Sequence, residues 1–323
     1  MKKYFIAAFV AVTCIAASFC GCAGNRNDAL QGIVFTKVYR DGQDGFFYRA
    51  EGELTAREEG DCYYIHGEYN GAVVEEVGDI CFDGTSNTLW LGEGIERIAD
   101  MAMQDEMGVS YMYLPASLQQ IGERAFYNAR TYNVTFFGTP DIGKYAFCGS
   151  SINKLYIPMD IKSGHGLADN AFCHSGLYTA ILYCNYIGRQ CFAYCNTLKY
   201  VDVGNVVDIL GEEAFIGSKN LSYADIGTNI PANAFKDCTS LLGVEVGPLV
   251  EYVYASAFSG CTSLSAVRFV VSEDWYVCKD EYSRPIAVAD FSTPENAVRQ
   301  FAEAAEQGYV FCRLPGYGMG ETV

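Results

Sequence analysis

A short phrase recurs along this chain at a nearly constant interval. Residues 234–241 read AFKDCTSL, and residues 257–264, which begin 23 positions later, read AFSGCTSL. The same phrase, usually opened by an apolar residue and Gly, returns throughout the middle of the chain. Its key position is occupied nine times, with a mean spacing of 22 over the 176 residues from first to last, at Phe82, Met103, Phe126, Phe147, Phe172, Phe192, Phe215, Phe235 and Phe258. A period of this length indicates a repeat architecture.

A second pattern follows each of these positions. After Phe192 it comprises Cys195, Leu198, Val201 and Val203, an alternation of apolar residues that indicates a short strand with one buried face. The Ala-Phe segment itself is typical of a short helical or 3-10 turn. One strand and one turn cannot bury their own apolar edge, whereas stacked copies can. The sequence therefore predicts an α/β repeat solenoid.

The combined phrase Ile-Gly-x-x-Ala-Phe-x-x-Cys-x-x-Leu-x-x-Val-x-Ile resembles the BspA-type leucine-rich repeat of bacterial and protist surface proteins. The match covers residues 77–269 and recurs from unit to unit, with two worn copies at its start. The resemblance implies a leucine-rich-repeat horseshoe with a parallel sheet on its concave side and short turns on the other. It also implies adhesin-like binding of host or bacterial proteins.

The apolar residues at the repeated positions are interpreted as scaffold, with each repeat Phe lying over its neighbours along the core. Cys195, Cys238 and Cys261 each stand three residues after a repeat Phe, so they are expected to stack as buried free thiols. Cys148 and Cys173 share a different register, one residue after a Phe, and whether they form a disulfide is left open. Without a C-x-x-C pair or zinc-like histidine spacing, neither a metal nor a cofactor is predicted.

The first 21 residues are predicted to be a lipoprotein-type signal peptide. Lys2 and Lys3 precede an apolar run, residues 4–18, that is too short to span a membrane. The run ends in Phe-Cys-Gly-Cys, which resembles the site where a bacterial lipoprotein is lipidated, here at Cys22. A lipidated chain is anchored at the outer membrane or cell surface without spanning it, and a chain that is not lipidated is secreted.

The remaining chain divides by pattern. Residues 22–31 are expected to be a tether, 32–75 an N-terminal β cap, 76–269 about nine repeats, and 270–323 a C-terminal α+β cap. The N-terminal cap shows hairpin patterns, and the C-terminal one contains a helix that begins at Ser292-Thr293-Pro294-Glu295. Both caps cover the apolar ends of an open solenoid.

Strand periodicity predicts which side chains point out of the concave sheet. One column comprises Trp90, Tyr113, Phe136, Tyr156, Ile181, Asp202, Asp225, Glu245 and Arg268, and its neighbour Thr88, Tyr111, Val134, Lys154, Thr179, Tyr200 and Tyr223. Around Phe136 the register is open, since Phe136 and Phe137 can exchange faces. The candidate ligand-binding residues are Trp90, Tyr111, Tyr113, Phe136, Tyr156, Tyr200, Tyr223, Asp202, Asp225 and Glu245, aromatic toward the N-terminal end and acidic toward the C-terminal end.

Charge and motifs narrow the function. The chain carries 39 acidic against 22 basic residues, a net charge of −17, which argues against nucleic acid as a partner. No nucleophile elbow, zinc-protease motif or phosphate-binding loop occurs, so an enzyme is not expected. The sequence predicts binding of an extracellular protein, or a glycan, through the aromatic face. The alternatives are a structural envelope lipoprotein in which the tyrosines only stabilise adjacent strands, and a carbohydrate-active enzyme using the acidic residues.

Overall fold

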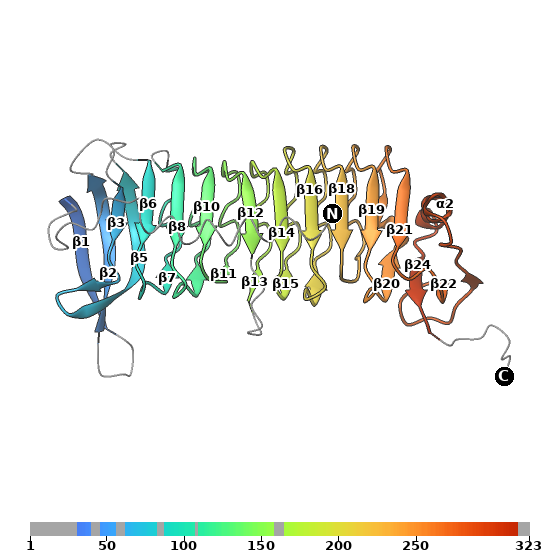
Figure 1. The fold of residues 1–323 in the computed structure, drawn as a ribbon, viewed down its shortest axis with the longest axis horizontal. Helices are drawn as coiled ribbons and strands as arrows, with labels where there is room; N and C mark the ends of the chain where they lie inside the picture. Colours follow the sequence, from blue (N-terminus) through green and yellow to red (C-terminus); the bar gives the residue numbers. More distant parts are fainter. Residues whose placement is uncertain are drawn as a thin grey trace.

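The computed structural model describes residues 31–39, 46–55, 62–82, 87–106, 109–157 and 165–315. The signal peptide, Cys22 and most of the tether lie outside these residues. The described chain winds into a parallel-strand solenoid of about nine turns. Figure 1 shows the turns side by side along an elongated rod, in chain order from the N-terminal hairpin to the C-terminal helix.

One strand of every turn belongs to a ten-stranded parallel sheet, here called the first sheet. Its strands are β3 (Tyr63–Ile65), β6 (Thr88–Leu91), β8 (Tyr111–Leu114), β10 (Asn133–Phe136), β12 (Lys154–Ile157), β14 (Thr179–Leu182), β16 (Tyr200–Val203), β18 (Tyr223–Ile226), β19 (Gly243–Val246) and β21 (Ala266–Phe269). From β6 onward the second and fourth residues of each strand are buried and the first and third face out. This alternation is the one the apolar pattern predicts, and it leaves a continuous outward face.

A second sheet runs along the rod beside the first. It begins with β1 (Gln31–Tyr39), β2 (Phe46–Thr55) and β5 (Ala72–Phe82), with β4 (Glu68–Tyr69) paired to β5, and continues as β7 (Arg97–Ile98), β9 (Gln120–Ile121), β11 (Asp141–Ile142), β13 (Gly166–Leu167), β15 (Tyr186–Ile187) and β17 (Ile209–Leu210). The apolar residue before each repeat Gly from Gly122 onward thus lies in a two-residue strand, whereas Val77, before Gly78, lies in the longer β5. Sequence reasoning missed these strands because two residues are too few to show a period-2 alternation.

The Ala-Phe segment forms the third wall of each turn. Among the described residues only η2 (Ala255–Phe258) is a 3-10 helix, and the other copies are hydrogen-bonded turns. The Phe126 N–H donates to the Ala146 carbonyl oxygen of the next turn (2.7 Å), and the pattern repeats along the rod. In these turns the residues two before and two after the Phe have positive φ, as at Arg124 and Asn128 (55° each). This backbone directs alternate N–H groups toward the next turn, so the turns are hydrogen-bonded in a ladder of their own.

The repeat phenylalanines form one stacked spine, as predicted. From Phe126 to Phe258 successive ring centroids are 4.8 to 5.6 Å apart, with interplanar angles of 1° to 17°. All but Phe258 are fully buried. The spine is the centre of a hydrophobic core that extends continuously from the N-terminal hairpin to the C-terminal helix.

The equivalent cysteines lie beside this spine as buried or half-buried free thiols. The Cys195 Sγ donates to the Phe172 carbonyl oxygen at 3.1 Å, and Cys238 and Cys261 make the same contact two and three turns further along. Burial raises the pKa of the Cys195 thiol to about 11. Cys148 and Cys173, one residue after their phenylalanines, form a disulfide, which settles the pairing that the sequence left open.

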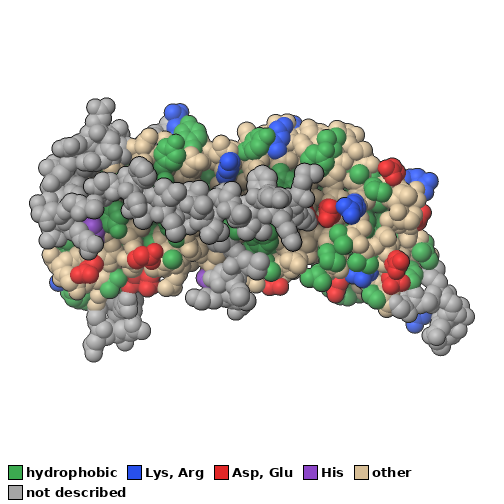
Figure 2. Space-filling model, viewed as in Figure 1, with side chains coloured by type: hydrophobic (Ala, Val, Ile, Leu, Met, Phe, Trp, Pro, Cys, Tyr) green, Lys and Arg blue, Asp and Glu red, His purple; other side chains and the backbone are tan. Residues whose placement is uncertain are grey.

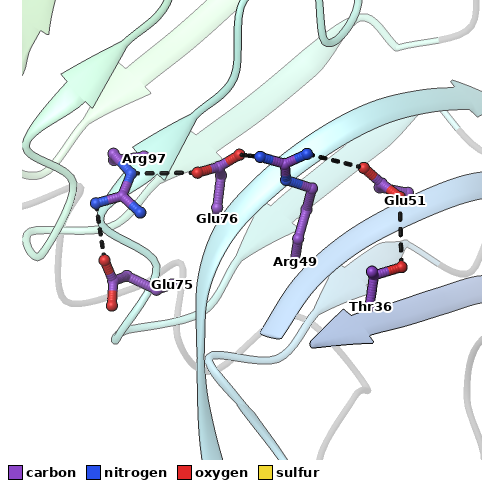
Figure 3. Close-up of polar contacts among 6 residues, drawn as sticks. All are labelled: Thr36, Arg49, Glu51, Glu75, Glu76 and Arg97. Atoms are coloured by element: carbon purple, nitrogen blue, oxygen red, sulfur yellow. Dashed lines mark hydrogen bonds and ion pairs between the residues drawn. The ribbon is translucent and has the colours of Figure 1, made fainter. Parts of the chain in front are cut away.

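An ion-pair network joins the N-terminal hairpin to the first turns (Figure 3). β1 and β2 are antiparallel, and β2 pairs in parallel with β5. Glu76 on β5, 8 % exposed, pairs with Arg49 of the hairpin (2.5 Å) and Arg97 of β7 (3.2 Å). Arg97 also pairs with Glu75 at 2.8 Å. Because the carboxylates of Glu75 and Glu76 are buried, these arginines compensate charges that would otherwise be costly.

The C-terminal end is covered by a helix and a small sheet. The helix α2 (Pro294–Ala305) begins where the sequence predicts, with the Thr293 hydroxyl accepting from the Asn296 N–H. Its Phe301 packs edge-on against Phe258, the last ring of the spine, at 5.1 Å. The sheet consists of β20 (Tyr252–Tyr254), β22 (Trp275–Cys278), β23 (Ala287–Val288) and β24 (Val310–Arg313). The helix therefore closes the apolar end of the stack.

Candidate functional site

The outward face of the first sheet carries nine of the ten candidate residues. Tyr111, Tyr156 and Tyr223 are 43 %, 44 % and 54 % exposed. The side chains half-buried on the same face are Trp90, Tyr113, Tyr200, Asp202, Asp225 and Glu245. Thr88, Lys154, Thr179, Ile181 and Arg268 also lie in the predicted columns. Parallel pairing sets these residues side by side, because the strands are in direct register.

Phe136 is the exception, and its assignment to this face is wrong. The side chain is 8 % exposed and meets the Phe147 ring edge-on at 6.3 Å, inside the core. Thr135 instead stands opposite Tyr113, and the predicted neighbour Val134 is buried as well. A one-residue shift of register exchanges the two faces of a strand. Two adjacent phenylalanines gave no sequence signal for choosing between the registers.

Stacked rings form the N-terminal part of the face. The Trp90 and Tyr113 ring centroids are 3.9 Å apart with an interplanar angle of 10°. Phe137, which follows β10 and is 39 % exposed, lies 6.4 Å from Trp90 at 20°. Tyr64 stands opposite Trp90 on β3. The sequence left open whether Phe136 or Phe137 faces outward, and it missed Tyr64 because β3 was placed in the cap. The rings make a broad, partly apolar platform.

Carboxylates and phenols form the C-terminal part. Asp202, Asp225, Glu245 and Arg268 occupy one register position on four successive strands. The Arg268 Nη1 lies 3.5 Å from the Glu245 Oε2. A shallow groove of about 470 Å³ is bordered by Tyr200, Asp225, Glu245 and Arg268. Burial, and then the negative charges of Asp202 and Asp225, raise the pKa of Tyr200 to about 12.

Glycine at position 243 leaves room for one of these rings. A Cβ there would lie 3.3 Å from the Tyr223 ring, closer than most such contacts. Tyr223 is thus able to lie across the neighbouring strand, where it forms a side of the groove.

The histidines of the irregular repeat interval do not meet on this face. The His165 Nδ1 lies 3.6 Å from the Asp141 Oδ1 at the second sheet, and the exposed His174 stacks on Tyr194 in the third wall. In the part of the chain that the structure describes, no group of three or more His, Cys, Asp or Glu side chains is placed to hold a metal ion. What the face offers is an extended surface with aromatic and acidic regions.

Parallel strands at a spacing of about 22 residues, with an inward apolar pattern and a stacked Phe spine, define a leucine-rich-repeat solenoid. The sequence model of the BspA-type leucine-rich repeat region matches six copies over residues 71–179 and 165–273. The chain therefore belongs to the BspA-type leucine-rich-repeat family. No curated protein matches the sequence.

Several solved bacterial proteins are similar in fold. The leucine-rich-repeat protein of Treponema pallidum is 17 % identical with a TM-score of 0.41, and the match covers 71 % of this chain and 87 % of that one. A leucine-rich cell surface protein of Faecalibacterium prausnitzii is 16 % identical (TM-score 0.34, 78 % and 97 % covered). The pneumococcal vaccine antigen PcpA is 14 % identical (0.32, 80 % and 91 %). At these identities the similarity concerns the repeat fold and carries no information about a ligand.

Among the residues described here, no helix is both long and apolar enough to cross a bilayer.

Proposed function

We propose that this protein is exported, displayed at the bacterial cell surface and binds an extracellular protein, in the manner of an adhesin, through the outward face of the first sheet. The observation that carries the proposal is the row of aromatic side chains on that face, from the stacked Trp90 and Tyr113 to the exposed Tyr223. Tyrosine and tryptophan dominate the binding energy of protein interfaces. A face with several of them in register therefore supplies multiple anchor points.

The acidic region favours a partner that presents lysine or arginine. Asp202, Asp225 and Glu245 lie in one row beside phenol rings, where an incoming cation meets both a carboxylate and a π face. The net charge of −17 adds long-range attraction for a basic surface. Figure 2 shows that carboxylates also occur elsewhere, along the lower margin of one long side and around the C-terminal end, where basic side chains are interspersed. We expect the charge to steer association and the rings to hold the complex.

Surface display rests on the leader pattern and on the family. Members of the BspA-type family are typically bacterial surface proteins. Lipidation at Cys22 would tether the rod through the segment that precedes β1. Intact mass spectrometry of the N-terminal peptide from a native bacterial membrane fraction tests this: a diacyl or triacyl glyceryl group on Cys22 supports it, and an unmodified Cys22 or a different mature N-terminus contradicts it.

The binding proposal is tested with the mature chain immobilised against a panel of purified extracellular matrix proteins and a glycan array. We expect a protein ligand, and at least about tenfold weaker binding by the Trp90→Ala/Tyr113→Ala variant. Tyr186→Ala removes a comparable ring from the second sheet, 39 % exposed, and serves as the control that leaves binding unchanged.

Other results separate the alternatives. Binding that is the same for wild type and the Trp90→Ala/Tyr113→Ala variant rules out this face. The absence of any ligand supports the structural envelope lipoprotein, in which the tyrosines act as cross-strand contacts. Hydrolysis of a model glycoside that is lost in Asp225→Asn would instead establish a carbohydrate-active enzyme.

A further inference from the structure

A second groove lies on the third wall, away from the first sheet. It has a volume of about 370 Å³ and spans the turns of Phe126, Phe147, Phe172 and Phe192. Its floor is the row of residues that directly follow these phenylalanines, and comprises Tyr127, the Cys148–Cys173 disulfide and Ala193. We call it the turn-wall groove. The disulfide and Ala193 are small, so the floor is low between Tyr127 at one end and Ile216 beyond the other.

Two rows of side chains border this floor. Arg124, Tyr145, Asn170 and Gln190 stand two residues before their phenylalanines, and His174 and Tyr194 stand two residues after theirs. All six have positive φ. This backbone conformation recurs in the other turns and is not peculiar to the groove. The combination of side chains differs further along the rod, where the same positions hold Glu213 and Asn233 before the phenylalanines and Gly217 and Asp237 after them.

The lining combines flat rings with planar hydrogen-bonding groups. The His174 and Tyr194 rings are parallel, with centroids 5.1 Å apart at 16°. The Arg124 guanidinium lies over the rings of Tyr127 and Tyr145, at 5.9 and 5.7 Å. The Asn170 amide offers a donor and an acceptor in a fixed plane, and the Gln190 Nε2 donates to the Glu213 Oε2 (2.7 Å), which orients the Gln190 Oε1 as an acceptor. No carboxylate lines the groove, although the chain as a whole is strongly acidic.

This composition suits a neutral, hydroxyl-rich ligand with apolar ring faces. A pyranose ring places C–H groups against an aromatic face and directs its hydroxyls toward surrounding amides. A basic peptide has no carboxylate to meet in the groove. An acidic one meets a single arginine, which is already engaged with two rings. Of these ligands, a chain of sugars matches both the rings and the planar polar groups.

The rise of the solenoid also fits a sugar chain. Successive rings of the spine beneath the groove are 4.8, 5.1 and 5.3 Å apart, so each turn advances by about the length of one pyranose unit. The bordering positions therefore recur once per sugar, while their residue types change from turn to turn. An extended peptide advances about 3.3 Å per residue, and its side chains would fall out of step with the turns.

We propose that the turn-wall groove binds a neutral oligosaccharide lying along the rod, with sugar rings on Tyr145 and Tyr194 and hydroxyls hydrogen-bonded to Asn170 and Gln190. The site is separate from the outward face of the first sheet and does not depend on the function proposed for that face. A protein that carries both would hold a polymeric glycan on one wall and a protein on another.

Isothermal titration of the mature, oxidised protein with cellotetraose, chitotetraose and maltotetraose at millimolar concentrations tests the proposal. We expect at least one of them to bind, and Tyr194→Ala to weaken that binding at least about tenfold. Asn170→Ala, which removes only a hydrogen-bonding group, is expected to weaken it as well and guards against loss of folding in the ring variant. Trp90→Ala/Tyr113→Ala should bind the sugar as the wild type does.

Three results overturn the proposal. The first is that none of the three oligosaccharides binds. The second is that Asn170→Ala and a folded Tyr194→Ala both bind the sugar as tightly as the wild type does. The third is that the Trp90→Ala/Tyr113→Ala variant loses sugar binding. The last would place the sugar on the first sheet. Loss of protein binding in that same variant, with sugar binding intact, would leave the turn-wall groove standing on its own.

Discussion

Replacing Phe192 by Ala is the sharpest test of the stacked spine. The ring is fully buried and lies between Phe172 and Phe215, with both centroids at 5.3 Å and interplanar angles of 9° and 8°. Truncation of such a ring costs about 3–5 kcal/mol in lost transfer energy and cavity formation. The two stacked contacts contribute about 1–3 kcal/mol of this, at 0.5–1.5 kcal/mol per pair.

The cavity is not expected to collapse. The backbone on either side is held by the ladder, in which the Phe192 N–H donates to the Ala214 carbonyl oxygen (2.7 Å) and the Phe192 carbonyl oxygen accepts from the Ser218 hydroxyl (2.9 Å). The cost should therefore lie in the upper part of the range. Because repeats contact only their neighbours, the damage should also be local.

Urea unfolding followed by circular dichroism measures the total, and hydrogen exchange locates it. We expect Phe192→Ala to lower the free energy of unfolding by about 4–5 kcal/mol, and Phe192→Leu, which keeps most of the volume, by about 1–3 kcal/mol. Faster exchange should be confined to the adjoining turns. Ile209→Ala, on a side chain 56 % exposed, should change stability by less than about 0.5 kcal/mol. A loss below about 1 kcal/mol for Phe192→Ala would refute the idea of a spine.

Three further predictions concern the hairpin seam and the cysteines. Glu76→Gln should cost about 1–3 kcal/mol, less than for a fully buried pair because Arg49 is partly exposed, and should speed hydrogen exchange in the N-terminal hairpin. Cys148→Ser breaks the 25-residue loop closed with Cys173 and should cost about 2–4 kcal/mol, measured by urea unfolding without reductant. At Cys195 the thiol titrates at about 11 when folded against 9.0 when free, so stability should fall as the pH rises from about 9 to about 11, and less steeply in Cys195→Ser.

Each of these has an outcome that contradicts it. Unchanged exchange in the hairpin of Glu76→Gln would mean that the hairpin docks without the ion pairs. Equal stability of the wild type with and without reductant would argue against a structural Cys148–Cys173 bond. If Cys195→Ser shows the same alkaline loss as the wild type, another group is responsible for it.

The sequence predicts the repeat and its core well because these depend on short, local patterns. The alternation from Val201 to Val203 indicates a strand with one buried face, and the recurring Phe indicates a stacked interior. The cap of α2 is also local, since Thr293 and Pro294 mark its start by residue type alone. For the candidate face, the same alternation placed Trp90 and Tyr223 outward without any knowledge of the neighbouring strands.

The sequence alone thus determined the period, the buried positions and most of the outward face, because each turn repeats the same local pattern. Tertiary structure alone decided the register at Phe136, which depends on pairing with β8, and the two-residue strands of the second sheet, which exist only through their neighbours. It also decided the disulfide and the turn-wall groove. The disulfide joins Cys148 and Cys173 of adjacent turns, and the groove brings Arg124 and Tyr194 together across four. The distance between turns is a property of the stack and is absent from any single repeat.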